Sequence, residues 1–165
     1  MKTLSICQPW ASLIAIGAKR FETRSWATKY RGPLAIHASK SFRTQEKNLI
    51  LSQPFKNALK NLCFRESVLE CDYGKNIFAF MPENLPLGKI IATCNLVDCL
   101  EIRTNGPRKG SKTENIMLIL PDEPELSFGD YNPGRHALLL TDVKMLPEPI
   151  PAKGQLGLWN WDGNP

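Results

Sequence analysis

ICQPWASLIAIGAKRFETRS, residues 6–25, joins an apolar segment to a segment in which charged and uncharged side chains alternate. The apolar part predicts a helix over residues 9–16, because a proline at the first helical position gives up only an amide that has no intrahelical partner. Trp10, Leu13 and Ile14 recur at helical spacing. We therefore expect a short helix with these three side chains on its buried face.

The second part of the stretch brings three ionisable side chains towards this helix. Gly17 can take the left-handed conformation that ends a helix, so the chain can reverse there. Arg20–Ser25 alternates as a strand does, which places Glu22 and Arg24 on one face. We expect Lys19, Glu22 and Arg24 to converge beside the helix. The alternative is a solvated ion pair on the surface, which would contribute little to stability.

Segments typical of strands surround this stretch. Short strands separated by Gly and Pro predict a small mixed β-barrel of the α+β class, with helices packed over an opening. The central strand is expected at Lys89–Ile102, which is long, apolar and rich in β-branched residues. Trp159 and Trp161 share one strand face, where they would seal the bottom of the barrel or, alternatively, stack on bases. The other expected strands are Lys2–Cys7, Pro33–Ala38, His136–Lys144 and Gln155–Trp161.

A helical insertion is expected at about residues 41–86, within one domain that spans residues 1–165. Ser39–Arg43 should form the first turn of this insertion. Pro54–Cys63 carries apolar side chains at helical spacing with lysines between them, which is typical of an amphipathic helix docked on the core. Arg65–Asn84 has no clear periodicity.

The five cysteines predict a reduced protein without disulfide bonds or a metal site. Their number is odd, they form no C-x-x-C pair, and only two histidines accompany them, whereas structural zinc needs four such ligands. Cys94 and Cys99 lie in the expected central strand, where they should be buried and unpaired. The apolar N-terminal run is broken by Gln8 and Pro9 and is too short to span a bilayer. We expect a cytoplasmic protein with no cofactor and no membrane association.

Positive charge is concentrated in the first part of the chain. Residues 1–65 contain 12 Lys and Arg against Glu22 and Glu46, a net charge of +10, whereas the whole chain carries +5. If this part folds onto one side, its field would attract phosphate backbones; the alternative is that the charges scatter over several faces. Residues 106–112 form a basic loop like that of phosphate-binding proteins. Ser111 stands where the second glycine of such a loop should be, which excludes nucleoside triphosphate hydrolysis.

Short motifs follow one another along the chain: Gln8-Pro9-Trp10, Gly17-x-Lys19-x-x-Glu22-x-Arg24-Ser25-Trp26, Tyr30-Arg31-Gly32, Ile36-His37-Ala38, Leu87–Ala92, Val97-Asp98-Cys99, Phe128–Arg135 and Gly154–Trp159. Their residues and order resemble the ASCH domain family, a branch of the PUA-like superfamily. The resemblance does not extend to Ser41–Pro86. It implies a PUA-like barrel with a cleft between the first helix and the barrel, and it places Gly17, Lys19, Glu22 and Arg24 at that cleft.

The resemblance implies a domain that binds RNA or a modified nucleoside, and we expect it to do so in a basic cleft between the first helix and the barrel. Cations would hold phosphate or carbonyl oxygens, and Glu22, kept ionised by its cationic neighbours, would accept a hydrogen bond from an exocyclic amine. Trp10 or Trp26 could supply a stacking surface for a base. The candidate binding residues are Trp10, Gly17, Lys19, Glu22, Arg24, Trp26, Arg31, Asp130 and Arg135.

The alternative, implied by other ASCH relatives, is a small hydrolase that uses the same cleft. A ribonuclease would use Lys19 and Glu22 as acid and base around a 2′-hydroxyl, with Arg24 stabilising the developing charge. In the amidohydrolase branch, which acts on acylated cytidine, a threonine nucleophile follows the lysine by three residues. That position holds Glu22 here, and Thr23 lies one residue away on the opposite strand face. This departure disfavours amide cleavage.

Overall fold

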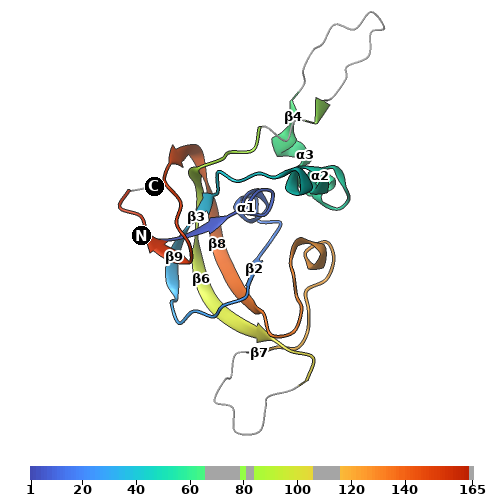
Figure 1. Ribbon diagram of the computed structural model, residues 1–165, viewed down its shortest axis with the longest axis vertical. Helices are drawn as coiled ribbons and strands as arrows, with labels where there is room; N and C mark the ends of the chain where they lie inside the picture. Colours follow the sequence, from blue (N-terminus) through green and yellow to red (C-terminus); the bar gives the residue numbers. More distant parts are fainter. Residues whose placement is uncertain (66–78, 81–83, 106–115, 164–165) are drawn as a thin grey trace, which may run out of the picture.

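The centre of the protein is a curled, mixed β-sheet, seen in a computed structural model that describes residues 1–65, 79–80, 84–105 and 116–163 (Figure 1). The strand order is β2-β8-β6-β3-β1-β9, with β7 paired to β6. The strands are β1 (Lys2–Ile6), β2 (Phe21–Arg24), β3 (Gly32–Ala38), β6 (Lys89–Ile102), β7 (Ile116–Met117), β8 (His136–Pro151) and β9 (Leu158–Asn160). Together with the helices described below, this sheet confirms the predicted α+β barrel-like fold.

Two long antiparallel strands, β6 and β8, form the middle of the sheet. Their register runs from Lys89 opposite Pro151 to Glu101 opposite His136, with three register shifts along the way. Such irregularities bend strands and increase their twist, which is how a sheet curls towards a barrel. The predicted central strand Lys89–Ile102 is confirmed. Strand β8 is longer than predicted, because its proline-rich end stays extended and pairs with β6 again through Ile150 and Pro151.

The N-terminal strand β1 lies between β3 and the C-terminal strand β9. It pairs in parallel with β3 and antiparallel with β9. Trp159 and Trp161 are 7% and 8% exposed, and they pack with Ala35 and Ile90 in one hydrophobic cluster. Rings buried in this way present almost no face to a base, so the structure favours packing over stacking for both tryptophans.

Helix α1 (Trp10–Ala15) covers the sheet, as predicted for residues 9–16. Ile14 is fully buried with β1, β3, β6 and β8 side chains in the main core, whereas Leu13 belongs to a second core shared with the other helices. Trp10 is half-buried and touches both cores. Because α1 lies between two hydrophobic clusters, its position relative to the strands is tightly fixed.

Two more helices, α2 (Thr44–Leu51) and α3 (Phe55–Cys63), pack over α1 at one end of the sheet (Figure 1). The amphipathic helix predicted at 54–63 is confirmed, since Phe55 and Leu59 are buried. The prediction that Ser39–Arg43 forms a first helical turn is wrong. The Ser39 hydroxyl accepts a hydrogen bond from Ser41 N at 3.0 Å, and such side-chain bonds compete with a helix.

A short ladder follows the helices, formed by β4 (Phe64–Arg65) and β5 (Ala79–Phe80). The basic loop at 106–112 and most of the segment at 65–84 lie outside the described residues. Within the part of the chain that is described, no helix is long and apolar enough to cross a membrane.

The cysteines of the central strand are buried free thiols, as predicted. Cys94 is 5% exposed and Cys99 is 7% exposed, and both are unpaired. Burial raises the pKa of the Cys94 thiol to about 12, which keeps the thiol protonated and unreactive at neutral pH. These side chains therefore act as small core residues.

Candidate functional site

Lys19 is buried because the end of α1 folds the chain back under the helix. Gly17 has a φ of +77°, and the amides of Ala18 and Lys19 both donate to Leu13 O, at 2.9 and 3.1 Å. A glycine suits this turn, since other residues rarely adopt a positive φ. The turn leaves the Lys19 side chain only 1% exposed and directs the following residues into β2.

Glu22 lies between two cations. Its Oε2 is 3.3 Å from Lys19 Nζ, and its Oε1 is 3.0 Å from Arg24 Nε. The Lys19 ammonium also donates to Phe21 O, and Arg24 Nη2 donates to Ser5 O at 2.9 Å. The predicted convergence of Lys19, Glu22 and Arg24 is confirmed. Burial lowers the pKa of Lys19, and the neighbouring Glu22 carboxylate opposes that effect.

A cavity of about 250 Å³ opens beside this cluster, and we call it the Glu22 cavity. Candidate residues from three parts of the chain meet there, namely from α1, from β2 and from the segment before β8. The wall is formed by Ile6, Cys7, Trp10, Glu22, Thr23, Arg24, Phe128, Gly129, Asp130 and Arg135. Two carboxylates and two guanidinium groups line it, so its own charges balance, and the additional positive charge is Lys19 behind Glu22.

Four candidate residues do not line this cavity. Lys19 touches Glu22 on the side facing the protein interior, and Gly17 is exposed at the end of α1. Trp26 is half-buried and packs against the main core. Arg31 pairs with Asp98 of β6 at 2.8 Å. The geometry therefore separates the candidates into a group that can touch a ligand in the cavity and a group that cannot.

The segment Phe128–Arg135 is fastened to β2 by hydrogen bonds. Asp130 N donates to Thr23 Oγ1 at 3.1 Å, and Arg135 Nη2 donates to Thr23 O at 3.5 Å. Arg135 Nε also donates to Asp130 O at 3.1 Å and lies 3.2 Å from the Asp130 carboxylate. Burial raises the pKa of Tyr131 in this segment, so its hydroxyl stays protonated. These hydrogen bonds therefore hold the part of the cavity wall formed by Phe128–Arg135 in a fixed position relative to β2.

Glu125 is a structural residue of the site that sequence reasoning missed. Its Oε1 accepts hydrogen bonds from the amides of Arg20 and Phe21 at 2.5 and 2.8 Å, and its Oε2 pairs with Arg20 Nε at 3.0 Å. The residue is 6% exposed and precedes the short helix η2 (Leu126–Phe128). The only sequence signal is an acidic residue in the run Asp122–Glu125. One carboxylate thus fixes the start of β2 next to Lys19.

Replacing Glu125 by alanine is expected to lower the free energy of unfolding by about 2–4 kcal/mol. The substitution leaves two partly buried backbone N–H groups without their carboxylate partner, at about 1–3 kcal/mol each. Denaturant unfolding of purified protein measures the effect. The matched control is Glu123→Ala, which removes an exposed carboxylate that binds the Ser127 hydroxyl at 2.9 Å. Equal losses for the two variants would contradict the role given to Glu125.

Comparison with known proteins gives one family and two similar relatives. The sequence model of the ASCH domain matches residues 4–144. Activating signal cointegrator 1 of Homo sapiens and of Mus musculus are each 34% identical to the chain over 125 residues, which is 74% of this chain and 19% of each relative. The chain thus spans about a fifth of the length of these relatives. The matched region includes every residue that lines the Glu22 cavity.

Proposed function

Because this chain belongs to the ASCH domain family, which is linked to RNA binding, we propose that it binds RNA and takes one base into the Glu22 cavity. The observation that carries the proposal is the buried ion-pair cluster at the cavity wall. Glu22 is held by two cations, it faces the cavity, and it is 7% exposed. The carboxylate oxygens are thereby held in place to accept a hydrogen bond from a ligand.

The size and walls of the cavity support a single base as the bound group. Its volume of about 250 Å³ lies just below the range of about 300–1,000 Å³ of drug-sized ligand sites. Trp10 forms one wall, where a ring can stack on a base, and Glu22 can accept a hydrogen bond from an exocyclic amine. Arg24 and Arg135 keep partly exposed guanidinium groups that can hold a carbonyl or phosphate oxygen. A modified nucleoside would meet the same groups.

A hydrolase that uses the same cavity is the second candidate. Glu22 and Arg24 both line the cavity, as a base and a cation for the developing charge would have to. Lys19 is 1% exposed, so in this mechanism it would position Glu22 and set its charge without touching the substrate. The expectation that Thr23 faces away from the cleft is wrong, since Thr23 lines the cavity together with Glu22 and Arg24. Amide cleavage stays disfavoured, because Glu22 holds the nucleophile position and the Thr23 hydroxyl already accepts a hydrogen bond from Asp130 N at 3.1 Å.

RNA binding is expected to weaken about 10–100-fold when Arg24 is replaced by methionine. The reason is the loss of a charge-assisted hydrogen bond, worth about 1.5–3 kcal/mol. Binding of wild type to a labelled single-stranded RNA is measured by anisotropy at several salt concentrations. The affinity should fall as salt rises, because phosphate contacts release counterions.

The control for this experiment is Lys144→Met, which removes an exposed cation of β8 outside the cavity. It should change the affinity less than twofold, roughly the effect expected of a distant surface charge. A binding curve that is independent of salt, or an Arg24→Met variant that binds as tightly as the control, would mean that the Glu22 cavity is not the RNA site.

A further inference from the structure

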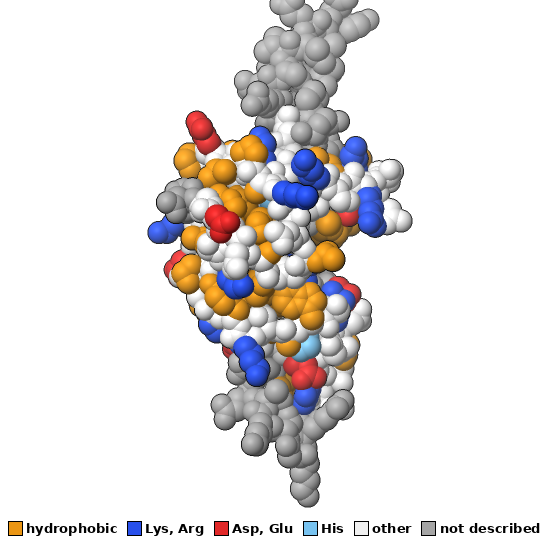
Figure 2. All heavy atoms as spheres, turned by 60° about the vertical axis from the view of Figure 1, so that its left-hand side comes forward, with side chains coloured by type: hydrophobic (Ala, Val, Ile, Leu, Met, Phe, Trp, Pro, Cys, Tyr) orange, Lys and Arg blue, Asp and Glu red, His pale blue; other side chains and the backbone are white. Residues whose placement is uncertain are grey.

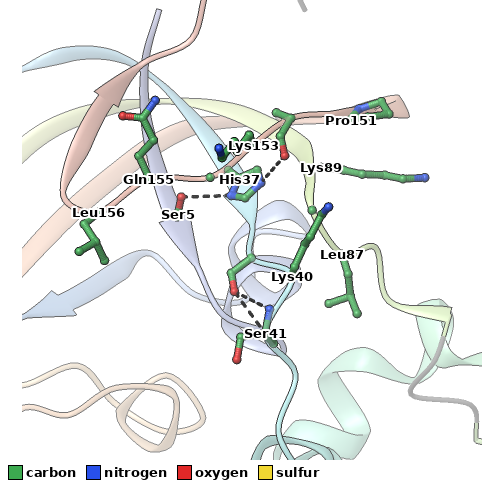
Figure 3. A pocket seen from close by; sticks show the side chains of 14 residues that line it. Ser5, His37, Lys40, Ser41, Leu87, Lys89, Pro151, Lys153, Gln155 and Leu156 are labelled. Carbon is green, nitrogen blue, oxygen red and sulfur yellow. Dashed lines mark hydrogen bonds between the residues drawn. The ribbon is translucent and has the colours of Figure 1, made fainter.

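A second pocket lies on the other side of strand β1, with a volume of about 970 Å³ (Figure 3). We call it the lysine pocket, because Lys40, Lys89 and Lys153 come to it from three separate segments of the chain. Lys40 follows β3, Lys89 begins β6, and Lys153 follows β8. The remaining lining residues are Ser5, His37, Ser39, Ser41, Leu87, Gly88, Pro151, Ala152, Gly154, Gln155 and Leu156. No acidic side chain is among them.

Within the part of the chain that the structure describes, the three lysines have no carboxylate partner. Among the described residues, every ion pair that involves a lysine or arginine lies elsewhere, at Lys19, Arg20, Arg24, Arg31, Arg103 and Arg135. Basic side chains also gather in the upper part of the face shown in Figure 2. The residues that line the lysine pocket thus carry three positive charges and no negative one, whereas the charges that line the Glu22 cavity balance one another.

The floor of the pocket is built from a fixed chain of hydrogen bonds. Trp159 Nε1 donates to Ser5 Oγ at 3.1 Å, Ser5 Oγ lies 3.1 Å from His37 Nδ1, and His37 Nε2 lies 3.2 Å from Ala152 O. Burial lowers the pKa of His37, which favours the neutral ring that donates to Ala152 O and accepts from Ser5. His37 is thus a structural residue, with both ring nitrogens satisfied by Ser5 and Ala152.

Two glycines let backbone and side chains approach closely around this floor. A Cβ on Gly154 would lie 2.4 Å from His37 Cε1, and a Cβ on Gly88 would lie 2.7 Å from Lys40 Cγ. The stem of Lys40 is therefore laid along the backbone at Gly88, beside the base of Lys89. Since both glycines are needed for this packing, the pocket is a formed part of the fold with defined walls.

The two cavities are neighbours across the end of β1. Ser5 O accepts a hydrogen bond from Arg24, whereas Ser5 Oγ belongs to the floor of the lysine pocket. Cys7 lines the Glu22 cavity and Ser39 lines the lysine pocket, and their Sγ and Oγ atoms are 3.8 Å apart. A ligand longer than one nucleotide can therefore lie over both.

We propose that the lysine pocket binds the phosphate backbone of the RNA strand whose base occupies the Glu22 cavity. The proposal rests on the function proposed above and adds the site where the charge of the strand is held. Ammonium groups are compact charges suited to phosphate oxygens. The Ser41 hydroxyl and Gln155 offer further donors to phosphate and sugar oxygens, and Leu87 with Leu156 gives an apolar surface for a ribose or base.

The test compares two triple variants of the whole chain with equal loss of charge. The first is Lys40→Met/Lys89→Met/Lys153→Met. The control is Lys29→Met/Lys56→Met/Lys144→Met, which removes three exposed lysines from other segments. The probe is a labelled single-stranded RNA about ten nucleotides long, a length within the usual site size of single-strand binders. Its affinity is measured over a range of salt concentrations.

The pocket variant should bind at least about tenfold more weakly than the control, and the slope of log affinity against log salt should become shallower by about 2. That value corresponds to three phosphate contacts at about 0.7 counterions each on a single strand. As a readout for each residue, bound RNA should protect Lys40, Lys89 and Lys153 from acetylation, as measured by mass spectrometry, and leave Lys29 reactive.

The outcomes separate the two proposals. If the pocket variant and the control bind alike while Arg24→Met weakens binding, the lysine pocket proposal is overturned and the Glu22 cavity stands. If the pocket variant loses affinity while Arg24→Met does not, the base-binding role of the Glu22 cavity fails and the lysine pocket remains as the phosphate site. A wild-type chain that binds no RNA overturns both.

Discussion

Replacing Glu22 by leucine is expected to lower the free energy of unfolding by about 3–5 kcal/mol, the loss that follows when one partner of a buried ion pair is removed. Lys19 is 1% exposed, and Glu22 is its ion-pair partner at 3.3 Å. Without Glu22 the Lys19 ammonium either stays charged and unpaired in the protein interior or loses its proton, and both cost free energy. In thermal unfolding of the purified variant, the melting temperature should therefore be lower than that of wild type by roughly 6–20 °C for a chain of this size.

A second substitution distinguishes the buried pair from a general packing defect. Adding Lys19→Met to Glu22→Leu removes the isolated cation and should recover much of the lost stability, because well-packed apolar residues often replace a buried pair at little cost. Arg31→Met, which breaks the more exposed pair with Asp98, serves as the control and should cost no more than about 1 kcal/mol. A double variant as unstable as Glu22→Leu alone would contradict the buried-pair argument.

The same pair makes a prediction about pH for the Glu22→Leu variant. Burial lowers the pKa of Lys19 in the folded protein, and Glu22, the main group that raises it, is gone in this variant. The folded state then favours the neutral amine, whereas the unfolded chain keeps the ordinary pKa of 10.5. The unfolded state binds the proton first as pH falls below that value, so the variant should lose stability from alkaline towards neutral pH.

The parts of the fold that could be predicted from sequence are those set by local patterns. The turn at Gly17, the alternation in β2 and the long β-branched run of β6 each follow from a few neighbouring residues. The convergence of Lys19, Glu22 and Arg24 was predictable for the same reason, since the three residues lie within one turn and one strand. The helical turn predicted at Ser39–Arg43 is wrong because serine side chains that bond to nearby backbone favour a turn over a helix.

The features that could not be predicted depend on pairing between distant segments. Glu125 binds backbone amides 104 and 105 residues away, and no local pattern distinguishes it from the acids beside it. The lysine pocket is assembled from the ends of β3, β6 and β8, so it exists only once the sheet order is known. Arg31 and Trp26 were expected at the ligand because they belong to the family's motifs, whereas the connection between β2 and β3 places Arg31 against Asp98 and Trp26 against the main core.

The two cavities differ in charge, as the two proposed roles require. In the Glu22 cavity, fixed ion pairs hold donors and acceptors in defined directions, which suits recognition of a base edge. In the lysine pocket, three cations without carboxylate partners among the described residues create a field that suits phosphates. Residues 1–65 carry a net charge of +10, but of their cations only Lys40 lines the lysine pocket. The other two lysines, Lys89 and Lys153, come from later parts of the chain.

Replacing Glu22 by glutamine separates the binding domain from the hydrolase. Glutamine keeps the shape of the side chain and an oxygen that can accept a hydrogen bond, but an amide cannot take up a proton as a carboxylate can. If the chain hydrolyses RNA with Glu22 as the base, Glu22→Gln should bind nearly as tightly as wild type and lose about 10²–10⁴-fold in turnover, the usual contribution of a general base. If the chain only binds, wild type shows no turnover, and Glu22→Gln loses preference among bases.

The assay incubates wild type, Glu22→Gln and the control Glu123→Gln with labelled RNA and, separately, with acylated cytidine, and it counts products against the bound fraction. Circular dichroism at the assay temperature must show each variant folded, because Glu22→Gln also weakens the pair with Lys19. Saturable RNA binding without product from either substrate decides for the binding domain. Turnover that survives Glu22→Gln would exclude Glu22 as the base. Among the described residues that line the cavity, Asp130 would then be the one remaining carboxylate, and it is already paired with Arg135.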